Sequence, residues 1–332
     1  MLIPMWRALA AAALLSTLSF GQNVYKQLAT YSLPGDTGWD YLTYDESSDR
    51  LFVAHGTSIL VVSPDGQKLG EFPANGAHGV AIVTDKGLGF SSNGRAGTVT
   101  VFDLKELKPI QEIKAGENPD AIIYDPYSKH VIVMNGRSKD IMAINPDTKK
   151  VDATVPLGGK LEFAVAMPGK VYVNVEDTGE IATVDSSTWK AVARWKLPDC
   201  EEPSGLAVDR KNNTLFTVCG NSKMLVIDAA SGKVLATVKT GDGTDAAGFD
   251  PGTGYAFASN GEGTLTVVGK KADKWDVIEN VPTQKSARTM TLDPKTHKVF
   301  TVAAEFNPPA PGERRGTVKP GSFKLIVLGP AK

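Results

Sequence analysis

The stretch that decides the fold is residues 121–155, which read AIIYDPYSKH VIVMNGRSKD IMAINPDTKK VDATV. Apolar and β-branched residues fill four short runs, at 121–124, 131–134, 141–145 and 151–155. Asp-Pro, Asn-Gly and Pro-Asp stand between the runs, where a chain reverses direction. The pattern predicts four consecutive antiparallel strands.

The opening phrase of that stretch returns along the chain. The related phrases are Tyr41-Leu-Thr-Tyr-Asp-Glu, Ala121-Ile-Ile-Tyr-Asp-Pro, Gly205-Leu-Ala-Val-Asp-Arg, Ala246-Ala-Gly-Phe-Asp-Pro and Thr289-Met-Thr-Leu-Asp-Pro. Seven units follow one another at a period of about 40 residues, and no helical pattern interrupts them. We therefore expect an all-β fold, a seven-bladed β-propeller of four-stranded antiparallel blades.

The two ends of the chain predict how the ring closes. The last unit stops at its third strand, Phe323–Leu328, whereas the N-terminal segment Tyr25–Leu33 has no blade of its own. Its phrase Ala29-Thr-Tyr-Ser-Leu-Pro-Gly resembles the outer-strand phrase Ala153-Thr-Val-Pro-Leu-Gly. The N-terminal strand is expected to complete blade seven and cover its open edge.

The first 21 residues predict an export signal. Arg7 precedes an apolar run, Ala8–Leu18, and Ser19-Phe-Gly gives small residues before a cut at Gln22. A membrane anchor is the alternative, but the run is shorter than the about 20 residues of a membrane span. We expect a signal peptide at 1–21, a single propeller domain at 22–332 without a membrane span, and a periplasmic or secreted protein.

The charge of the chain is nearly balanced. Lys and Arg total 36 against 37 Asp and Glu, so no net field attracts nucleic acid, and none is expected as a partner. We expect a monomer.

Several phrases resemble the YVTN-type β-propeller repeat family, and within it the exported YncE-like group. They are Trp39-Asp-Tyr-Leu, Asn118-Pro-Asp-Ala, Glu162-Phe-Ala-Val, Glu202-Pro-Ser-Gly-Leu-Ala and Ala287-Arg-Thr-Met-Thr-Leu-Asp-Pro. The resemblance covers nearly all of the chain after the signal. It implies a seven-bladed propeller outside the cytoplasm and carries over no agreed catalytic residues.

A polar residue opens the inner strand of every blade. This inner-strand ring consists of Asp40, His78, Asp120, Glu162, Ser204, Asp245 and Arg288. We expect these side chains to face the mouth of the central channel and to bind a small polar ligand or a protein partner there. The alternative is that they are solvated, or cap the loop backbone as Asp and Ser often do.

A second set of residues ends the second strand of each blade. This second-strand ring is His55, Asn93, Asn135, Val175, Cys219, Asn260 and Ala303. We count its histidine and asparagines as candidate mouth residues, with Arg95, Arg137, Glu176 and Glu305. The alternatives are that the Asn-Gly pairs serve only a two-residue hairpin turn and that the arginines are solvated.

Cys200 and Cys219 are the two cysteines of the chain, and both fall on the mouth side of blade five. In an exported protein a disulfide between them is expected. Two free thiols are the alternative, and a metal role lacks the usual Cys-x-x-Cys spacing.

Sequence signatures of catalysis are missing from the chain: it has no Gly-x-Ser-x-Gly, no His-Glu-x-x-His and no Cys-x-x-Cys-His. A binding protein without catalysis is therefore the leading interpretation, with no cofactor. The main alternative is a calcium-dependent, lactonase-like hydrolase that would use Asp40, Asn135, Glu162 and Asp245. A second alternative is an accessory propeller for periplasmic redox enzymes.

Blade seven departs from its siblings by a long loop at 307–321, rich in proline and glycine. Long loops without structure of their own are usually functional or disordered. Because this one leaves on the mouth face, we expect it to cover part of the mouth or to contact a partner.

Overall fold

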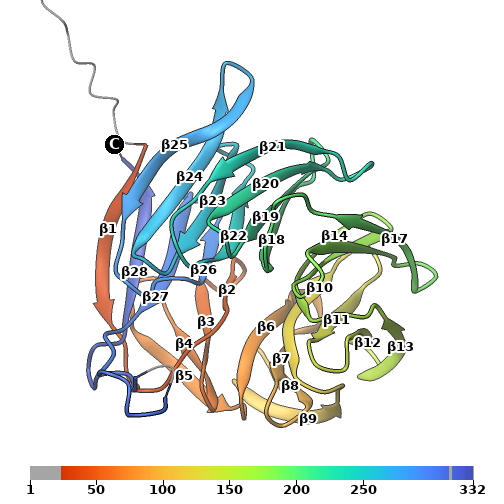
Figure 1. Cartoon of the computed structure of the whole chain (residues 1–332). Helices are drawn as coiled ribbons and strands as arrows, with labels where there is room; N and C mark the ends of the chain where they lie inside the picture. Colours follow the sequence, from red (N-terminus) through yellow and green to blue (C-terminus); the bar gives the residue numbers. More distant parts are fainter. Residues whose placement is uncertain (1–23, 314–315, 332) are drawn as a thin grey trace, which may run out of the picture.

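The computed structural model describes residues 24–313 and 316–331. They form seven sheets of four antiparallel strands, arranged as blades around a central axis (Figure 1). The predicted all-β, seven-bladed propeller is confirmed. Among the described residues the only helical segment is a single 3₁₀ turn, Thr84–Lys86, and none of their helices is long and apolar enough to cross a membrane.

The strands run from the inside of each blade outwards in chain order. Blade one holds β2 (Leu42–Asp45), β3 (Arg50–His55), β4 (Ser58–Val62) and β5 (Lys68–Pro73). Blade two holds β6 (Ala77–Val83), β7 (Leu88–Asn93), β8 (Thr98–Asp103) and β9 (Lys108–Lys114). Blade three holds β10 (Pro119–Asp125), β11 (His130–Asn135), β12 (Asp140–Asn145) and β13 (Lys150–Pro156). Blade four holds β14 (Leu161–Met167), β15 (Lys170–Val175), β16 (Glu180–Asp185) and β17 (Lys190–Lys196).

The remaining blades keep the same order until the ring closes. Blade five holds β18 (Pro203–Asp209), β19 (Thr214–Cys219), β20 (Lys223–Asp228) and β21 (Val234–Lys239). Blade six holds β22 (Thr244–Asp250), β23 (Tyr255–Asn260), β24 (Thr264–Lys271) and β25 (Lys274–Pro282). Blade seven holds β26 (Met290–Asp293), β27 (Lys298–Ala303), β28 (Lys324–Pro330) and β1 (Tyr25–Ser32).

Ring closure follows the prediction from the two chain ends. Strand β1 pairs with β28, with Tyr25 opposite Pro330 and Ser32 opposite Lys324 (Figure 1). The phenol of Tyr25 is buried and donates a hydrogen bond to the backbone oxygen of His297 (2.9 Å). The first and last described strands therefore stabilise one blade together.

The aspartate of the repeated phrase explains the turn that follows the inner strand in blades one, three, five, six and seven. Asp125 accepts a bond from the backbone N–H of Tyr127 (2.9 Å), and Asp250 accepts one from Gly252 (2.9 Å). Both carboxylates are fully buried. A carboxylate that bonds the backbone two residues ahead forms the turn directly. The inner strands of blades two and four end at Val83 and Met167 and turn without it.

The core lies between the blades. The described residues form seven apolar clusters, and each of them joins two neighbouring blades. Flat sheets packed face to face leave their inner strands around an axis, with the strand starts at one end. The fold thus brings seven equivalent positions to one mouth.

The outer edge of each blade carries a bulge. In all seven blades the pairing of the outer strand shifts by one residue near its middle. The shift leaves residues such as Leu28, Leu69 and Val192 exposed. A bulge twists an edge strand away from regular pairing, so it protects the ring from edge-to-edge association.

Candidate functional site

The inner-strand ring reaches the mouth because the inner strands are irregular where these residues stand. In blades two to six the ring residue is the second residue of the strand, and pairing with the next strand is interrupted there. In blades one and seven, Asp40 and Arg288 precede β2 and β26. A bulge redirects a side chain out of the regular alternation. The ring residues therefore leave the packed interface between blades.

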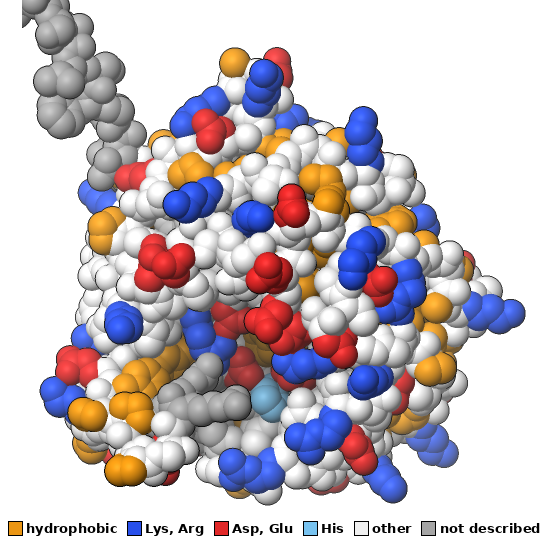
Figure 2. Space-filling view, viewed as in Figure 1, with side chains coloured by type: hydrophobic (Ala, Val, Ile, Leu, Met, Phe, Trp, Pro, Cys, Tyr) orange, Lys and Arg blue, Asp and Glu red, His pale blue; other side chains and the backbone are white. Residues whose placement is uncertain are grey.

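Six members of the ring line one cavity of about 510 Å³. Its polar lining is Asp40, Asp120, Lys160, Glu162, Glu176, Glu202, Ser204, Thr244, Asp245 and Arg288, together with Tyr41. The seventh member, His78, lines an adjoining cavity of about 540 Å³ that shares Asp40. Figure 2 shows acidic and basic side chains gathered around the hollow centre of this face. The structure thus brings the whole inner-strand ring to one mouth.

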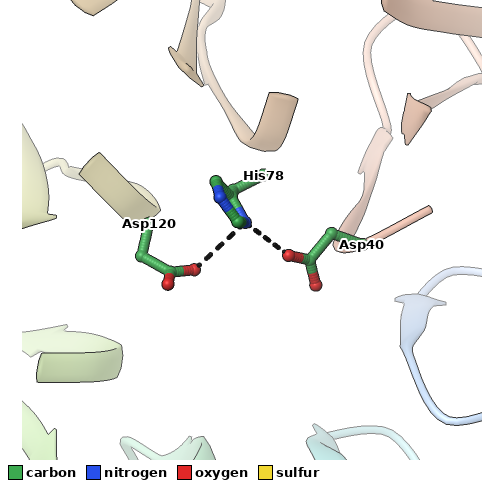
Figure 3. Close-up of side chains that lie close together, drawn as sticks. All are labelled: Asp40, His78 and Asp120. Atoms are coloured by element: carbon green, nitrogen blue, oxygen red, sulfur yellow. Dashed lines mark hydrogen bonds and ion pairs between the residues drawn. The ribbon is translucent and has the colours of Figure 1, made fainter. Parts of the chain in front are cut away.

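Asp40, His78 and Asp120 form a cluster at the start of blades one, two and three (Figure 3). Nδ1 of His78 lies 2.6 Å from Oδ2 of Asp40 and 3.5 Å from Oδ1 of Asp120. Burial by itself would lower the pKa of His78, but the hydrogen bond to Asp40 and the charge of Asp120 outweigh it and raise the pKa. Burial raises the pKa of Asp120 to about 6.

Arg288 closes the ring between blades seven and one. Its guanidinium is paired with Asp245 and lies 4.0 Å from Oδ1 of Asp40. Burial favours the neutral form of Arg288, yet these two carboxylates raise its pKa. The guanidinium is thus held as a fixed charge inside the mouth.

A second cluster lies on blade four. Nζ of Lys160 is 2.8 Å from Oε1 of Glu162 and is also paired with Glu176. Burial, followed by the contact with Glu176, raises the pKa of Glu162 to about 9. The pKa of Glu176 is lowered instead, because its bonds to Glu162 and Lys160 outweigh its burial. Burial thus disfavours the charged form of Glu162, whereas Glu176 is stabilised as the carboxylate.

Tyr41 crosses the channel beneath these charges. It leaves blade one, and its O–H donates to Oε2 of Glu162 on blade four (3.4 Å), while its ring packs on Phe163 (5.2 Å between centroids). Burial raises its pKa well above the usual value. The equivalent position in blade two is Gly79, and a Cβ there would lie 3.6 Å from Cδ2 of Tyr41. The ring of Tyr41 therefore lies close to blade two where it narrows the channel.

The second-strand residues predicted to face the mouth, His55, Asn93, Asn135 and Asn260, are instead buried, and neither mouth cavity is lined by them. Nδ2 of Asn93 donates to Oγ1 of Thr100 (2.7 Å), and Nδ2 of Asn135 donates to Oδ1 of Asp140 (2.7 Å). Nδ2 of Asn260 donates to the hydroxyls of Thr264 (2.9 Å) and Thr266 (3.0 Å). These amides bond within their own blades.

The two-residue hairpin offered as the alternative for these asparagines is also absent. The second and third strands of blades two, three and six are joined by longer turns, 94–97, 136–139 and 261–263. The positive φ angle falls at the last residue of each turn, at Gly97, Lys139 and Gly263. Asparagine stands at these sites because its amide bonds across the turn, and not because of its tolerance of positive φ.

Four other predicted residues lie apart from the central cavity. His55 is buried, stacks on Phe323 (4.7 Å between centroids) and bonds to Thr37, so it is a core residue. Arg95 lines the adjoining cavity with His78. Arg137 is exposed on the matching turn of blade three, and Glu305 is exposed and paired with Lys319 (2.9 Å).

Cys200 and Cys219 are joined by a disulfide. Cys219 occupies the blade-five position of the second-strand ring, and Cys200 lies on the connection that leads into β18. In blade five the disulfide therefore takes the place of the amide bonds that asparagines make in blades two, three and six.

The described part of the long loop borders the mouth. Phe306 pairs with Val318, and its ring lies 5.8 Å from that of Trp39. Together with Arg288 and Pro309 these aromatic residues line a further cavity of about 860 Å³. The loop thus forms one wall beside the mouth, next to blade one.

The donors named for a calcium site are not assembled. Asp40, Glu162 and Asp245 line the central cavity, but Asn135 is fully buried and bonds to Asp140 in its own blade. This set therefore lacks its neutral oxygen donor.

Sequence reasoning missed Tyr41 and Lys160. Tyr41 stands inside the phrase Trp39-Asp-Tyr-Leu, directly after the ring residue Asp40. At the equivalent positions of the seven blades, Tyr41 and Phe163 are aromatic and the other five residues are small. That break in a series of otherwise small residues was the available signal. Lys160 has no equivalent in the other blades, so the repeat gave none.

The seven four-stranded sheets and the charged cavity show that the protein is a seven-bladed β-propeller whose channel mouth is charged and open to solvent. Solved structures with the same fold include the WD40 repeats of RRP9, with a TM-score of 0.76 and 10% identity over 93% of this chain and all of that one. The structure of U3-55K matches with a TM-score of 0.72 and 10% sequence identity, over 90% of this chain and 98% of that one. Hydrazine synthase of Kuenenia stuttgartiensis matches with a TM-score of 0.68 and 16% sequence identity, over 81% of this chain and 93% of that one.

These identities are low, so the likeness concerns the fold alone. No family model and no curated protein matches the sequence. Function must therefore be argued from the mouth itself.

Proposed function

We propose that this protein is an exported propeller of the YVTN type, in the YncE-like group, which binds a small polar ligand with a positive charge at its channel mouth. It holds the ligand without transforming it. The observation that carries this proposal is the charge of the central cavity, where six carboxylate side chains face two basic ones.

Both basic side chains are already paired within the mouth. Arg288 is paired with Asp245, and Lys160 with Glu162 and Glu176. Even with Glu162 protonated, negative groups remain in excess. Low-dielectric walls concentrate such a field, which favours a cation over an anion or a neutral sugar.

The shape of the site suits a small molecule entering from one end. Tyr41 reaches across the channel and limits the depth of the mouth. A cavity of about 510 Å³ has the size of a metabolite site.

Export is supported by the disulfide in blade five, since such bonds persist in oxidising compartments. The predicted signal peptide, residues 1–21, lies outside the described residues. The proposed mature protein is the single propeller domain from residue 22 onward.

Isothermal titration calorimetry of EDTA-treated protein tests the proposal, with putrescine, spermidine and choline as cationic probes and citrate as the anionic comparison. We expect at least one cation to bind one to one, and the variant Glu176→Gln/Glu202→Gln to weaken it tenfold or more, about 1.4 kcal/mol. The matched control is Glu71→Gln, because Glu71 pairs with Lys68 on the outer strand of blade one. The proposal is contradicted if citrate binds more tightly than every cationic probe. It is also contradicted if the Glu176→Gln/Glu202→Gln variant and the Glu71→Gln control bind the cation equally well.

A further inference from the structure

Asp40, His78 and Asp120 bring three side chains that can ligate a metal together from three blades. One imidazole nitrogen and one oxygen from each carboxylate all lie within 4.8 Å of one another (Figure 3). Ligands of an ion at about 2.0–2.2 Å lie about 3–3.5 Å apart. Nδ1 of His78 lies 3.5 Å from Oδ1 of Asp120, within that range, and 2.6 Å from Oδ2 of Asp40, a hydrogen bond that a bound ion would replace.

We propose that Asp40, His78 and Asp120 bind a divalent first-row transition-metal ion at the channel mouth. Calcium and magnesium prefer sites made of oxygen alone, whereas an imidazole nitrogen with two carboxylates suits zinc, manganese or iron(II). This site differs from the calcium site suggested by the sequence. It shares only Asp40 with that set, and its donors suit a different metal.

The outer oxygens of both carboxylates are held by neighbours. Nδ2 of Asn118 donates to Oδ2 of Asp120 (3.3 Å), and the guanidinium of Arg288 lies 4.0 Å from Oδ1 of Asp40. In each case the other oxygen is the one turned to His78. Partners that orient the remaining oxygen of a ligand are typical of metal sites.

The position of the cluster leaves room for further ligands. Asp40 borders both mouth cavities, Asp120 lines one and His78 the other. Three protein ligands with open positions beside a solvent-accessible cavity would be completed by water or by a small molecule. Asp40 and Asp120 also line the cavity of the proposed organic cation, so the two proposals are tested separately, each with its own probes.

The test is calorimetry of the full chain, produced without a histidine tag, with ZnCl₂, MnCl₂ and CoCl₂ as probes. We expect one ion per chain, and an affinity at least tenfold lower for His78→Ala and for Asp120→Asn. Asp120→Asn keeps the side-chain shape, so it decides the matter should the histidine variant not fold. The visible spectrum of the Co²⁺ form should change in the same variants.

The matched control is His130→Ala, which removes another histidine in contact with an aspartate, Asp152, at 3.1 Å. It should bind the ion as the parent does. The inference is overturned if no ion binds one to one, if Asp120→Asn binds as tightly as the parent, or if His130→Ala loses the ion equally. The organic cations are titrated after EDTA treatment, so the two tests are independent. Absence of metal binding would leave the proposed organic-cation site intact, and absence of organic-cation binding would leave the metal site intact.

Discussion

The inner-strand ring and the second-strand ring look alike in the sequence but differ in the folded protein. Both repeat once per blade and both are mostly polar. The first opens into two cavities, whereas the second is buried and bonds across its own turns. The difference comes from strand pairing. In blades two to six a bulge turns the first set outwards, while regular pairing keeps the second set inside the blade. Polarity at a repeated position therefore does not distinguish a binding residue from one that stabilises a turn.

The disulfide gives the largest expected effect among the turn contacts. Replacing both cysteines, Cys200→Ala/Cys219→Ala, removes a bridge that spans 19 residues, and should lower the free energy of unfolding by about 3 kcal/mol. Urea denaturation measures it, and the parent in reductant should match the variant. A parent that loses no stability in reductant would show that the second-strand ring does not stabilise blade five.

Asn260→Ala should have the next largest effect. It removes an amide that bonds to Thr264 and Thr266 inside blade six, so we expect a loss of about 2 kcal/mol, because buried hydroxyls lose their partner. Affinity for the cationic probe should not change. Asn221→Ala is the control, since its bond to the backbone oxygen of Asp199 is solvent-exposed (3.0 Å); an equal loss in both variants would argue against a special role for burial.

Glu162→Gln sharpens the comparison through pH. The pKa of Glu162 is raised to about 9 in the folded protein, so the folded state holds a proton that the unfolded state releases near pH 4.5. The parent should therefore lose stability as pH rises from about 4.5 to 9. The Gln variant should lack this loss and gain on the parent as pH rises, in urea titrations at pH 5, 7 and 9. A gap that is constant over this range would mean that Glu162 is ionised throughout.

Arg95 and Arg137 give the smallest expected effects. Both occupy the same turn position and both are exposed, but Arg95 lines a mouth cavity beside His78. Arg95→Ala should strengthen binding of the cationic probe by about 0.5 kcal/mol, because one positive charge is removed, and Arg137→Ala should leave it unchanged. Identical calorimetric results for the two variants would place both arginines outside the field of the mouth.

The sequence by itself determined the propeller, because each blade is specified by local patterns. Short runs of apolar and β-branched residues, the turn residues between them and the truncated last repeat predicted the blades. They also predicted a closing strand at Tyr25–Leu33, which the structure shows at Tyr25–Ser32. The same regularity predicted that Asp40, His78, Asp120, Glu162, Asp245 and Arg288 share one end of the channel. Because the blades repeat around one axis, equivalent positions lie at the same end of the channel. The shared location of these side chains could therefore be predicted from the sequence.

Tertiary structure alone decided what depends on distances between blades. The approach of Asp40 and Asp120 to one nitrogen of His78 joins residues from three blades, and Tyr41 spans from blade one to blade four. No local pattern encodes such contacts, because they arise from how far each side chain extends over the axis. The burial of Asn93 and Asn260 was equally hidden, since the direction of a side chain depends on strand register. A repeat specifies which residues come to the mouth, and packing between the blades determines which of them touch.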